Sequence, residues 1–119
     1  MGYVRVKGVI ANPLKREVRV EVEFIADTGA IYTMISKTIA EKLGLEIMGK
    51  RKFRVASGDA VEYPVAEAYI IVEDRGVTSL VVIGPENTIP LLGVTTLELL
   101  GYQVDPVTGK LKPLELMIL

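Results

Sequence analysis

The sequence predicts a single all-β domain that carries one or two short helices. Its 119 residues are enough for one domain with a core of its own, but too few for two. Half of the residues are hydrophobic and 24% are charged, a balance typical of a globular chain rather than a disordered one. Short strand-like segments recur along the chain, and clusters of Asn, Asp, Gly and Pro separate them.

The first two strands are predicted to form a hairpin. Residues Tyr3–Ala11 alternate loosely between apolar and polar side chains and end at the turn signal Asn12-Pro13. Residues Arg16–Phe24 alternate cleanly, which is the pattern of a strand with one buried face. The buried face is expected to consist of Val18, Val20, Val22 and Phe24.

A second unit is predicted to follow as strand, helix and strand. Ile31–Ile35 is a short apolar strand, and Ser36 can cap a helix that begins directly after it. The helix is expected over Lys37–Leu43, because Gly44 favours the left-handed conformation that ends many helices. Leu45–Met48 then returns as a strand.

A longer hairpin is predicted in the middle of the chain, at about residues 51–65. Arg51–Ala56 and Ala60–Val72 have the composition of strands. The connection between them is a turn of the kind found in hairpins, formed by Ser57, Gly58 and Asp59. From these residues alone, a plain surface hairpin and a hairpin that closes over a ligand are about equally supported.

The next segments read as turn, strand, loop and helix. A turn at Asp74–Gly76 precedes the apolar strand Val77–Ile83, and Gly84–Ile89 forms a loop. A helix is expected at about residues 94–100, and Gly101 ends it.

The C-terminal tail is predicted to form two strands, Tyr102–Asp105 and Lys110–Leu119, around a turn. Its end is strongly apolar, with Leu114, Leu116, Met117, Ile118 and Leu119. Such a strand either packs in its own core or pairs with another subunit, because an exposed apolar edge invites pairing. The sequence leaves both open.

Composition excludes most kinds of catalysis. The chain has no Cys, so it has no disulfides and no thiolate chemistry, and no His, which removes Ser-His-Asp triads and most zinc sites. A net charge of −1 gives no electrostatic case for nucleic acid. No membrane span or signal peptide is recognisable, so we expect a soluble, cytoplasmic protein. We predict no cofactor and no metal, which leaves hydrolysis by carboxylate and water.

One acid lies in a context suited to that chemistry. Asp27 begins an Asp-Thr-Gly turn between two apolar runs, which an exposed turn does not need. The other three aspartates are in ordinary turn contexts: Asp59, Asp74 and Asp105. Two carboxylates about 3 Å apart can share a proton and activate water. Each chain offers one such acid, so a pair of this kind would need a second copy, and a two-fold axis brings like residues together.

The stretch Asp27-Thr28-Gly29-Ala30 resembles the active-site signature of retroviral-type aspartic proteases, the retropepsins. A second resemblance lies in Val81–Pro85 followed by Ile89–Gly93 and a helix, the same order as a retropepsin strand, loop and helix. The resemblance implies a closed-barrel-like fold with one lobe per chain. It also implies a homodimeric endopeptidase that takes extended peptide or protein segments with hydrophobic side chains.

By the same resemblance, Asp27 is the shared acid and base, and Thr28 hydrogen-bonds across the two-fold axis. Gly29 permits close approach of substrate, and Ala30 packs beneath the carboxylate. The central hairpin corresponds to the flap that closes over substrate. The remaining substrate-binding residues implied are Ser57, Gly58, Asp59, Thr88 and Ile89.

The chain departs from many retropepsins after Ala30, where Ile31 and Tyr32 replace acidic residues. This departure and the helix after the second strand favour a cellular relative. Two alternatives stay open: a non-catalytic peptide-binding or dimerisation module on the same fold, and a small β domain in which the turn motif arose by chance.

Overall fold

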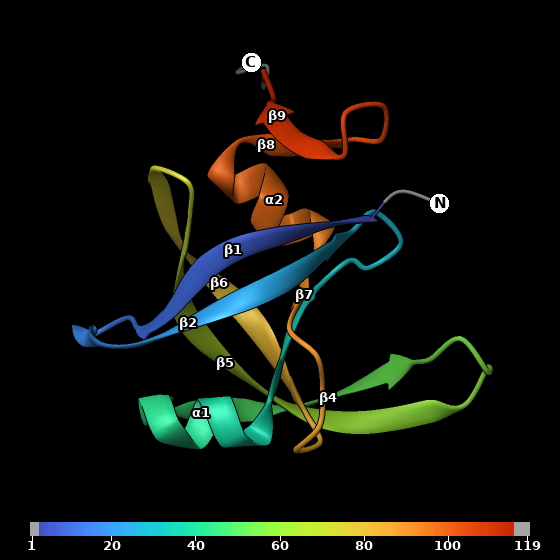
Figure 1. Cartoon of the computed structure of the whole chain (residues 1–119). Coiled ribbons are helices and arrows are strands. Elements are labelled where there is room, and N and C mark those ends of the chain that lie inside the picture. The colour runs from blue at the N-terminus through green and yellow to red at the C-terminus, as the bar shows by residue number, and fades with distance from the viewer. Residues whose placement is uncertain (1–2, 116–119) are drawn as a thin grey trace, which may run out of the picture.

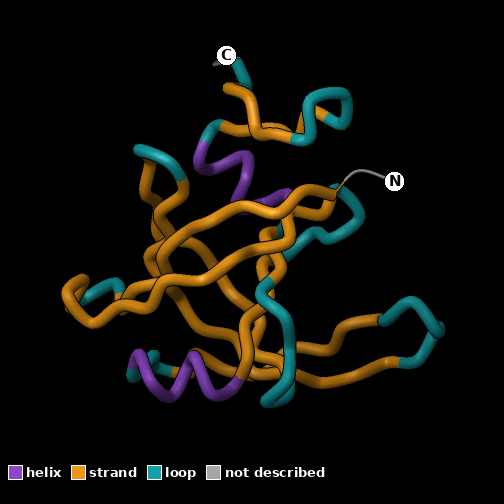
Figure 2. Tube along the Cα trace, viewed as in Figure 1, coloured by secondary structure: helices purple, strands orange, loops and turns teal. Residues whose placement is uncertain are grey.

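The computed structural model describes residues 3–115 and shows a β-barrel with one helix toward each end (Figures 1 and 2). The strands of the main sheet are β1 (Tyr3–Asn12), β2 (Lys15–Asp27), β3 (Thr33–Ser36), β4 (Ile47–Arg54), β5 (Ala60–Val72), β6 (Arg75–Gly84) and β7 (Leu91–Leu92). The helices are α1 (Lys37–Leu43) and α2 (Val94–Leu100). Both helices occupy the predicted residues.

The barrel closes because β1 pairs on both of its edges. The main sheet has the order β1-β2-β7-β3-β6-β5-β4, and β1 also pairs with the second half of β5. This extra pairing closes a ring between β1 and β5 and leaves β4, the last strand of the series, outside it, paired with the first half of β5. The predicted all-β, closed-barrel-like fold with one lobe is therefore confirmed.

Apolar side chains that alternate with polar ones along the strands fill the barrel interior. The apolar face predicted for β2 points inward: Val18, Val20 and Val22 are half-buried against the core, and Phe24 is fully buried. Every other barrel strand adds buried apolar side chains, among them Ile10, Ile35, Ile70, Val81 and Leu92. Burial of this apolar surface is the main driving force for folding.

The barrel consists of two similar halves. In each half an antiparallel hairpin (β1–β2 or β5–β6) is followed by a short strand and then a helix. The short strand of each half pairs in parallel with the second hairpin strand of the other half: β3 with β6, and β7 with β2. The connections after β2 and β6 therefore cross into the other half, so neither half completes its sheet alone.

Hairpin residues also cap both helices at their C-termini. The Asn12 side-chain amide donates to the carbonyl oxygen of Leu43 at 3.0 Å, at the end of α1. The Arg75 guanidinium donates to the carbonyl oxygens of Leu100 and Gly101 at 3.1 and 2.8 Å, at the end of α2. These bonds satisfy carbonyls that a helix cannot satisfy internally, and they tie each helix to the barrel.

Several predicted boundaries were wrong. The strand expected from Ile31 begins at Thr33, because the preceding carbonyls bond to α2 instead of to a strand. The two strands expected at Leu45–Met48 and Arg51–Ala56 are one strand, β4, over Ile47–Arg54, because the long strand β5 pairs along it and the interruption is a β-bulge near Gly49. The expected turn at 74–76 lies one residue earlier, since Val72 pairs directly with Arg75.

The tail forms a separate hairpin of β8 (Tyr102–Asp105) and β9 (Lys110–Pro113), at the top of Figure 1. The strand predicted to reach Leu119 ends at Pro113, after which the Leu114 amide donates to the Gly101 carbonyl at 2.8 Å. The apolar residues 116–119 lie outside the described residues, so their predicted role in pairing stays a prediction. Within residues 3–115, no helix has the length and apolar character needed to span a membrane.

Candidate active site

Asp27 is the last residue of β2, at a strand end fixed from both sides. On one side Asp27 pairs with Tyr3 of β1. On the other, the Ile25 amide donates to the Pro90 carbonyl at 3.0 Å, just before β7. The neighbouring Ala26 is fully buried, whereas Asp27 itself is half-buried. Strand β2 therefore holds the Asp27 backbone in a fixed position at the edge of the core.

The turn after Asp27 orients its carboxylate. The Gly29 amide donates to Oδ1 of Asp27 at 2.8 Å, and the Ala30 amide donates to the Asp27 backbone carbonyl at 3.1 Å. A Cβ at residue 29 would lie 3.3 Å from Oδ1, so a side chain there would press on the carboxylate. Thr28 and Gly29 are exposed at the tip of the turn and Ala30 is half-buried. The turn thus offers the acid and its neighbours to a second molecule.

The first turn of α2 holds the loop that follows. The Val94 amide donates to the Ala30 carbonyl at 2.8 Å, and the Thr95 amide donates to the Ile31 carbonyl at 3.0 Å. These bonds use amides that a helix N-terminus leaves without an internal partner. Gly93 makes this approach possible, because a Cβ at that position would overlap the backbone of Tyr32. Helix α2 and the acidic turn therefore form one packed unit.

A chain of hydrogen-bonded, buried hydroxyl groups supports α2 and the acidic turn from the core. The Gly93 amide donates to Oγ1 of Thr33 at 3.0 Å, and the hydroxyls of Thr33 and Thr96 are hydrogen-bonded. The Thr96 hydroxyl also bonds to Oγ of Ser79 at 2.8 Å, which reaches the Leu80 carbonyl at 3.2 Å. Since the amide only donates and the carbonyl only accepts, a single direction of donation satisfies every group. The sequence analysis missed this chain, whose signal is three hydroxyl residues at core-facing positions.

Thr96→Val is expected to destabilise the protein by about 1–3 kcal/mol, because it leaves buried hydroxyls of Thr33 and Ser79 without their partner. Valine has nearly the shape of threonine, so the loss reports the hydrogen bonds and not a cavity. The control is Thr95→Val on the same helix, where the side chain is only half-buried. Chemical denaturation measures both. Equal stability of the two variants would contradict the role of the hydroxyl chain.

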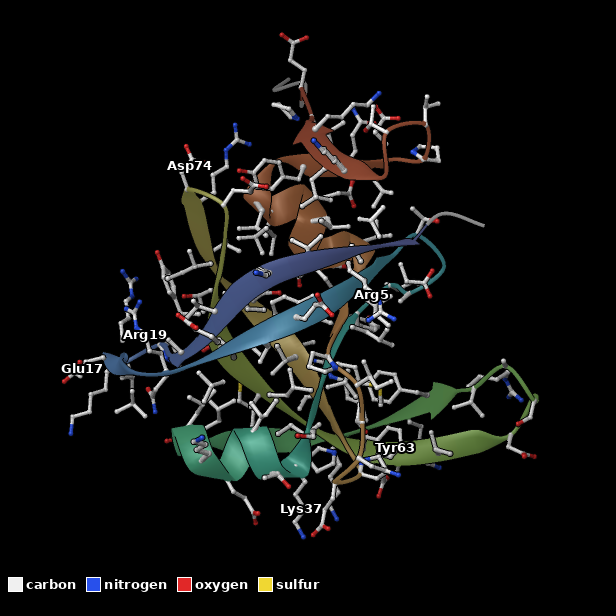
Figure 3. The ribbon with its side chains drawn as sticks, viewed as in Figure 1. Arg5, Glu17, Arg19, Lys37, Tyr63 and Asp74 are labelled. Atoms are coloured by element: carbon white, nitrogen blue, oxygen red, sulfur yellow. The ribbon has the colours of Figure 1, made fainter. Side chains whose placement is uncertain are left out.

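The other aspartates each bond within their own turn or to an adjacent strand. Asp59 accepts from the Ser57 hydroxyl at 3.1 Å, and Asp74 accepts from the Tyr102 hydroxyl at 3.1 Å. Asp105 accepts from the amide of Val107 at 3.0 Å, which lowers the pKa of its carboxyl group. Figure 3 labels Asp74 at the left of the molecule, whereas the loop that follows β2 lies at the right. Asp74 therefore does not supply a second carboxylate beside Asp27.

The predicted flap, at about residues 51–65, lies within the longer β4–β5 hairpin, whose tip holds Ser57, Gly58 and Asp59. Gly58 has a φ of 91°, a left-handed conformation that favours glycine. The tip is braced internally: the Gly58 amide donates to the Val55 carbonyl at 2.8 Å, and the Arg54 guanidinium to the Gly58 carbonyl at 2.6 Å. In Figure 1 this hairpin and the loop after β2 project from the same side of the barrel.

The two substrate-binding residues predicted in the loop before β7, Thr88 and Ile89, differ in how exposed their side chains are. Ile89 is 59% exposed and directly precedes Pro90, which bonds to β2 near the acid. Thr88 is half-buried, and its hydroxyl lies over Gly84, where a Cβ would meet it at 2.5 Å. Ile89 is thus presented beside the end of β2, whereas Thr88 packs largely within its own loop. Among residues 3–115, no three His, Cys, Asp or Glu side chains gather closely enough to hold a metal ion.

Comparison with known proteins gives the family. The model of a family described as "gag-polyprotein putative aspartyl protease" matches residues 18–99, more than half of the chain. The chain belongs to this family of retroviral-type aspartyl proteases. The match includes the acidic turn, the β4–β5 hairpin and most of α2. The resemblance noted in the sequence is therefore confirmed.

A solved structure shares the aspartyl protease fold. It is that of a foamy viral protease-reverse transcriptase in complex with an RNA/DNA hybrid, and it is 16% identical to this chain with a TM-score of 0.61. The similarity covers 98% of this chain but only 13% of the foamy viral chain. The present chain thus spans about one eighth of that protein, and the likeness bears on the fold alone. No curated protein matches the chain.

In this aspartyl protease family member, the structure brings some of the predicted site residues together and leaves others apart. Asp27, Thr28, Gly29 and Ala30 form one hydrogen-bonded turn, and Ile89 lies near the same strand end. The hairpin-tip residues bond among themselves. An aromatic contact between Tyr32 and Phe53 joins the β4–β5 hairpin to the loop that follows the acidic turn. This contact was not predicted from the sequence.

Proposed function

We propose that two copies of this chain form an aspartic endopeptidase that cleaves extended peptides. The observation that carries the proposal is the presentation of Asp27 from a fixed strand end, in an Asp-Thr-Gly turn held by α2. Membership of the aspartyl protease family supports it. An acid that served only as a turn residue would not need this support from two strands and a helix.

The chemistry needs two carboxylates, and one chain supplies one. In the proposed dimer a two-fold axis brings Asp27 against its copy, about 3 Å away, where the pair shares one proton. The ionised partner takes a proton from a water held between them, and the oxygen of that water attacks the scissile carbonyl carbon. The protonated partner donates a hydrogen bond to the carbonyl oxygen. As the C–N bond breaks, a proton passes to the leaving nitrogen.

The neighbours of the acid have proposed roles in the same arrangement. Thr28 is exposed beside Asp27, so the axis that pairs the acids also brings Thr28 near its copy. Substrate would lie extended between the acidic turn and the β4–β5 hairpin, adding main-chain hydrogen bonds as an extra strand does. The exposed apolar side chains of Ile31 and Ile89, at 65% and 59% exposure, favour hydrophobic substrate side chains.

A peptide-library digest tests the activity. We expect cleavage within peptides at bonds flanked by hydrophobic side chains, and inhibition by a peptide with a hydroxyl-bearing, non-cleavable bond that mimics the tetrahedral intermediate. Binding of extended peptides without cleavage at any pH would instead support the non-catalytic peptide-binding or dimerisation module.

Specific activity is expected to fall on dilution. Each monomer lacks half of the site, so activity per molecule should drop once the concentration passes below the dissociation constant of the dimer. Activity and sedimentation velocity, measured over the same dilution series, should share one midpoint. Full activity in samples that sediment as monomer would show that a second acid operates within one chain.

A further inference from the structure

The β4–β5 hairpin extends from the barrel with little support of its own. In strand β4 every residue is exposed except Phe53, which is half-buried. The register partners of β4 all lie in β5, and a two-stranded hairpin is only marginally stable alone. In the outer part of the hairpin, the side chain of Phe53 is therefore where β4 gains contact beyond its partner strand.

That contact is with Tyr32, on the loop that follows the acidic turn. The ring centroids of Tyr32 and Phe53 are 5.8 Å apart and the ring planes meet at 72°, an edge-to-face arrangement that aromatic pairs prefer. Tyr32 is a fixed anchor, because Gly93 packs on its backbone and the carbonyl of the preceding Ile31 accepts from α2. One ring thus belongs to the rigid site and the other to the extended hairpin.

Phe53 lies close enough to the hairpin tip for its contact with Tyr32 to restrain the tip. Phe53 pairs with Val61 and directly precedes Arg54, whose guanidinium bonds to the Gly58 carbonyl at the tip. Because the tip is braced by its own hydrogen bonds, it moves together with the residues around Phe53. A ring contact at this point therefore couples the position of the tip to the loop that carries Tyr32.

We propose that Tyr32 and Phe53 are positioning residues that form an aromatic clasp, holding the hairpin against the loop that follows the acidic turn before substrate arrives. The catalytic part of this inference rests on the proposed function, whereas the clasp itself does not. With the clasp open, the hairpin samples positions away from the turn, and substrate binding has to restore the closed position. Loss of the clasp therefore weakens substrate binding more than it slows the bond-breaking step.

Hydrogen exchange followed by mass spectrometry tests the clasp without reference to activity. In the full-length chain without substrate, Phe53→Ala and Tyr32→Ala are each expected to speed amide exchange in residues 47–66 by about 2- to 10-fold, the factor that corresponds to an edge-to-face pair. The double variant should exchange no faster than either single one, because both remove the same contact. Tyr32→Phe retains the ring and should behave as wild type. Val55→Ala controls for loss of an apolar side chain beside the same tip.

Kinetics supply a second readout. We expect KM to rise about 2- to 10-fold in both alanine variants, with kcat changed by less than about 2-fold. Unchanged exchange in the single variants, or additive effects in the double one, would overturn the clasp. If exchange responds as expected in a protein that cleaves no peptide, the clasp stands and the proposed function fails. If the protein cleaves peptides but exchange is unaltered, only the clasp fails.

Discussion

Asp27→Asn is expected to lower kcat by at least about 1,000-fold while the barrel and the dimer persist. A positioned acid–base group contributes about 100- to 10,000-fold, and here the substitution removes both members of the proposed pair at once. The amide of asparagine occupies nearly the same space, and its side-chain oxygen can still accept from the Gly29 amide that now bonds to Oδ1. Peptide cleavage measures the loss, while circular dichroism and sedimentation check fold and assembly.

A control substitution and a subunit-mixing experiment show whether the loss of activity is specific to Asp27 and depends on the dimer. Asp74→Asn changes an aspartate far from the acidic turn and should retain most activity, since the asparagine oxygen can still accept from the Tyr102 hydroxyl. When Asp27→Asn protein is mixed and allowed to exchange subunits with wild type, each mixed dimer has one carboxylate. Activity should then fall with the square of the wild-type fraction. A linear fall would show that each chain works alone, and an active Asp27→Asn protein would remove the proposed chemistry.

Gly93→Ala is expected to destabilise the protein by about 1–3 kcal/mol, the usual cost of forcing atoms into a packed region. A Cβ at this position would overlap the backbone of Tyr32, and backbone has little freedom to yield. Moving α2 away would also strain its bonds to the carbonyls of Ala30 and Ile31. Activity should therefore fall together with stability, which denaturant titration and peptide cleavage measure in parallel.

Gly93→Ser separates this packing effect from helix capping. Gly93 is the N-cap of α2 and makes no side-chain capping bond, so capping preference alone predicts that serine stabilises the helix. The close approach to Tyr32 predicts the opposite, a loss similar to that of alanine. At the corresponding position of α1, Ser36→Gly should cost only a few tenths of a kcal/mol. A Gly93→Ser protein as stable as wild type would refute the packing argument.

The predictions that succeeded depend on local signals. Clean alternation in Arg16–Phe24 identified β2 and its inward face, and Ser36 and Gly44 correctly marked the ends of α1. Family membership was recognisable from the acidic turn together with the Gly-Pro strand end downstream. Each of these signals lies within a few residues, where backbone preference and side-chain periodicity act directly.

The predictions that failed involve partners distant in the sequence. No local rule shows that the carbonyls of Ala30 and Ile31 bond to α2 instead of to a strand, and this is why β3 starts at Thr33. β4 is continuous because the long β5 supplies partners along its length and absorbs one residue in a bulge. In each case the local preference was weak, and a hydrogen-bonding partner from another element decided the outcome.

By itself, the sequence determined the class of fold, the order of its elements and the acid around which a site is built. The tertiary structure alone decided that β1 closes the barrel on β5, that buried hydroxyls hold α2 against the loop after the acidic turn, and that Tyr32 contacts Phe53. The physical reason is that periodicity and turn preference are encoded within neighbouring residues. Ring closure, satisfaction of buried polar groups and aromatic contacts depend instead on which distant segments the completed barrel brings together.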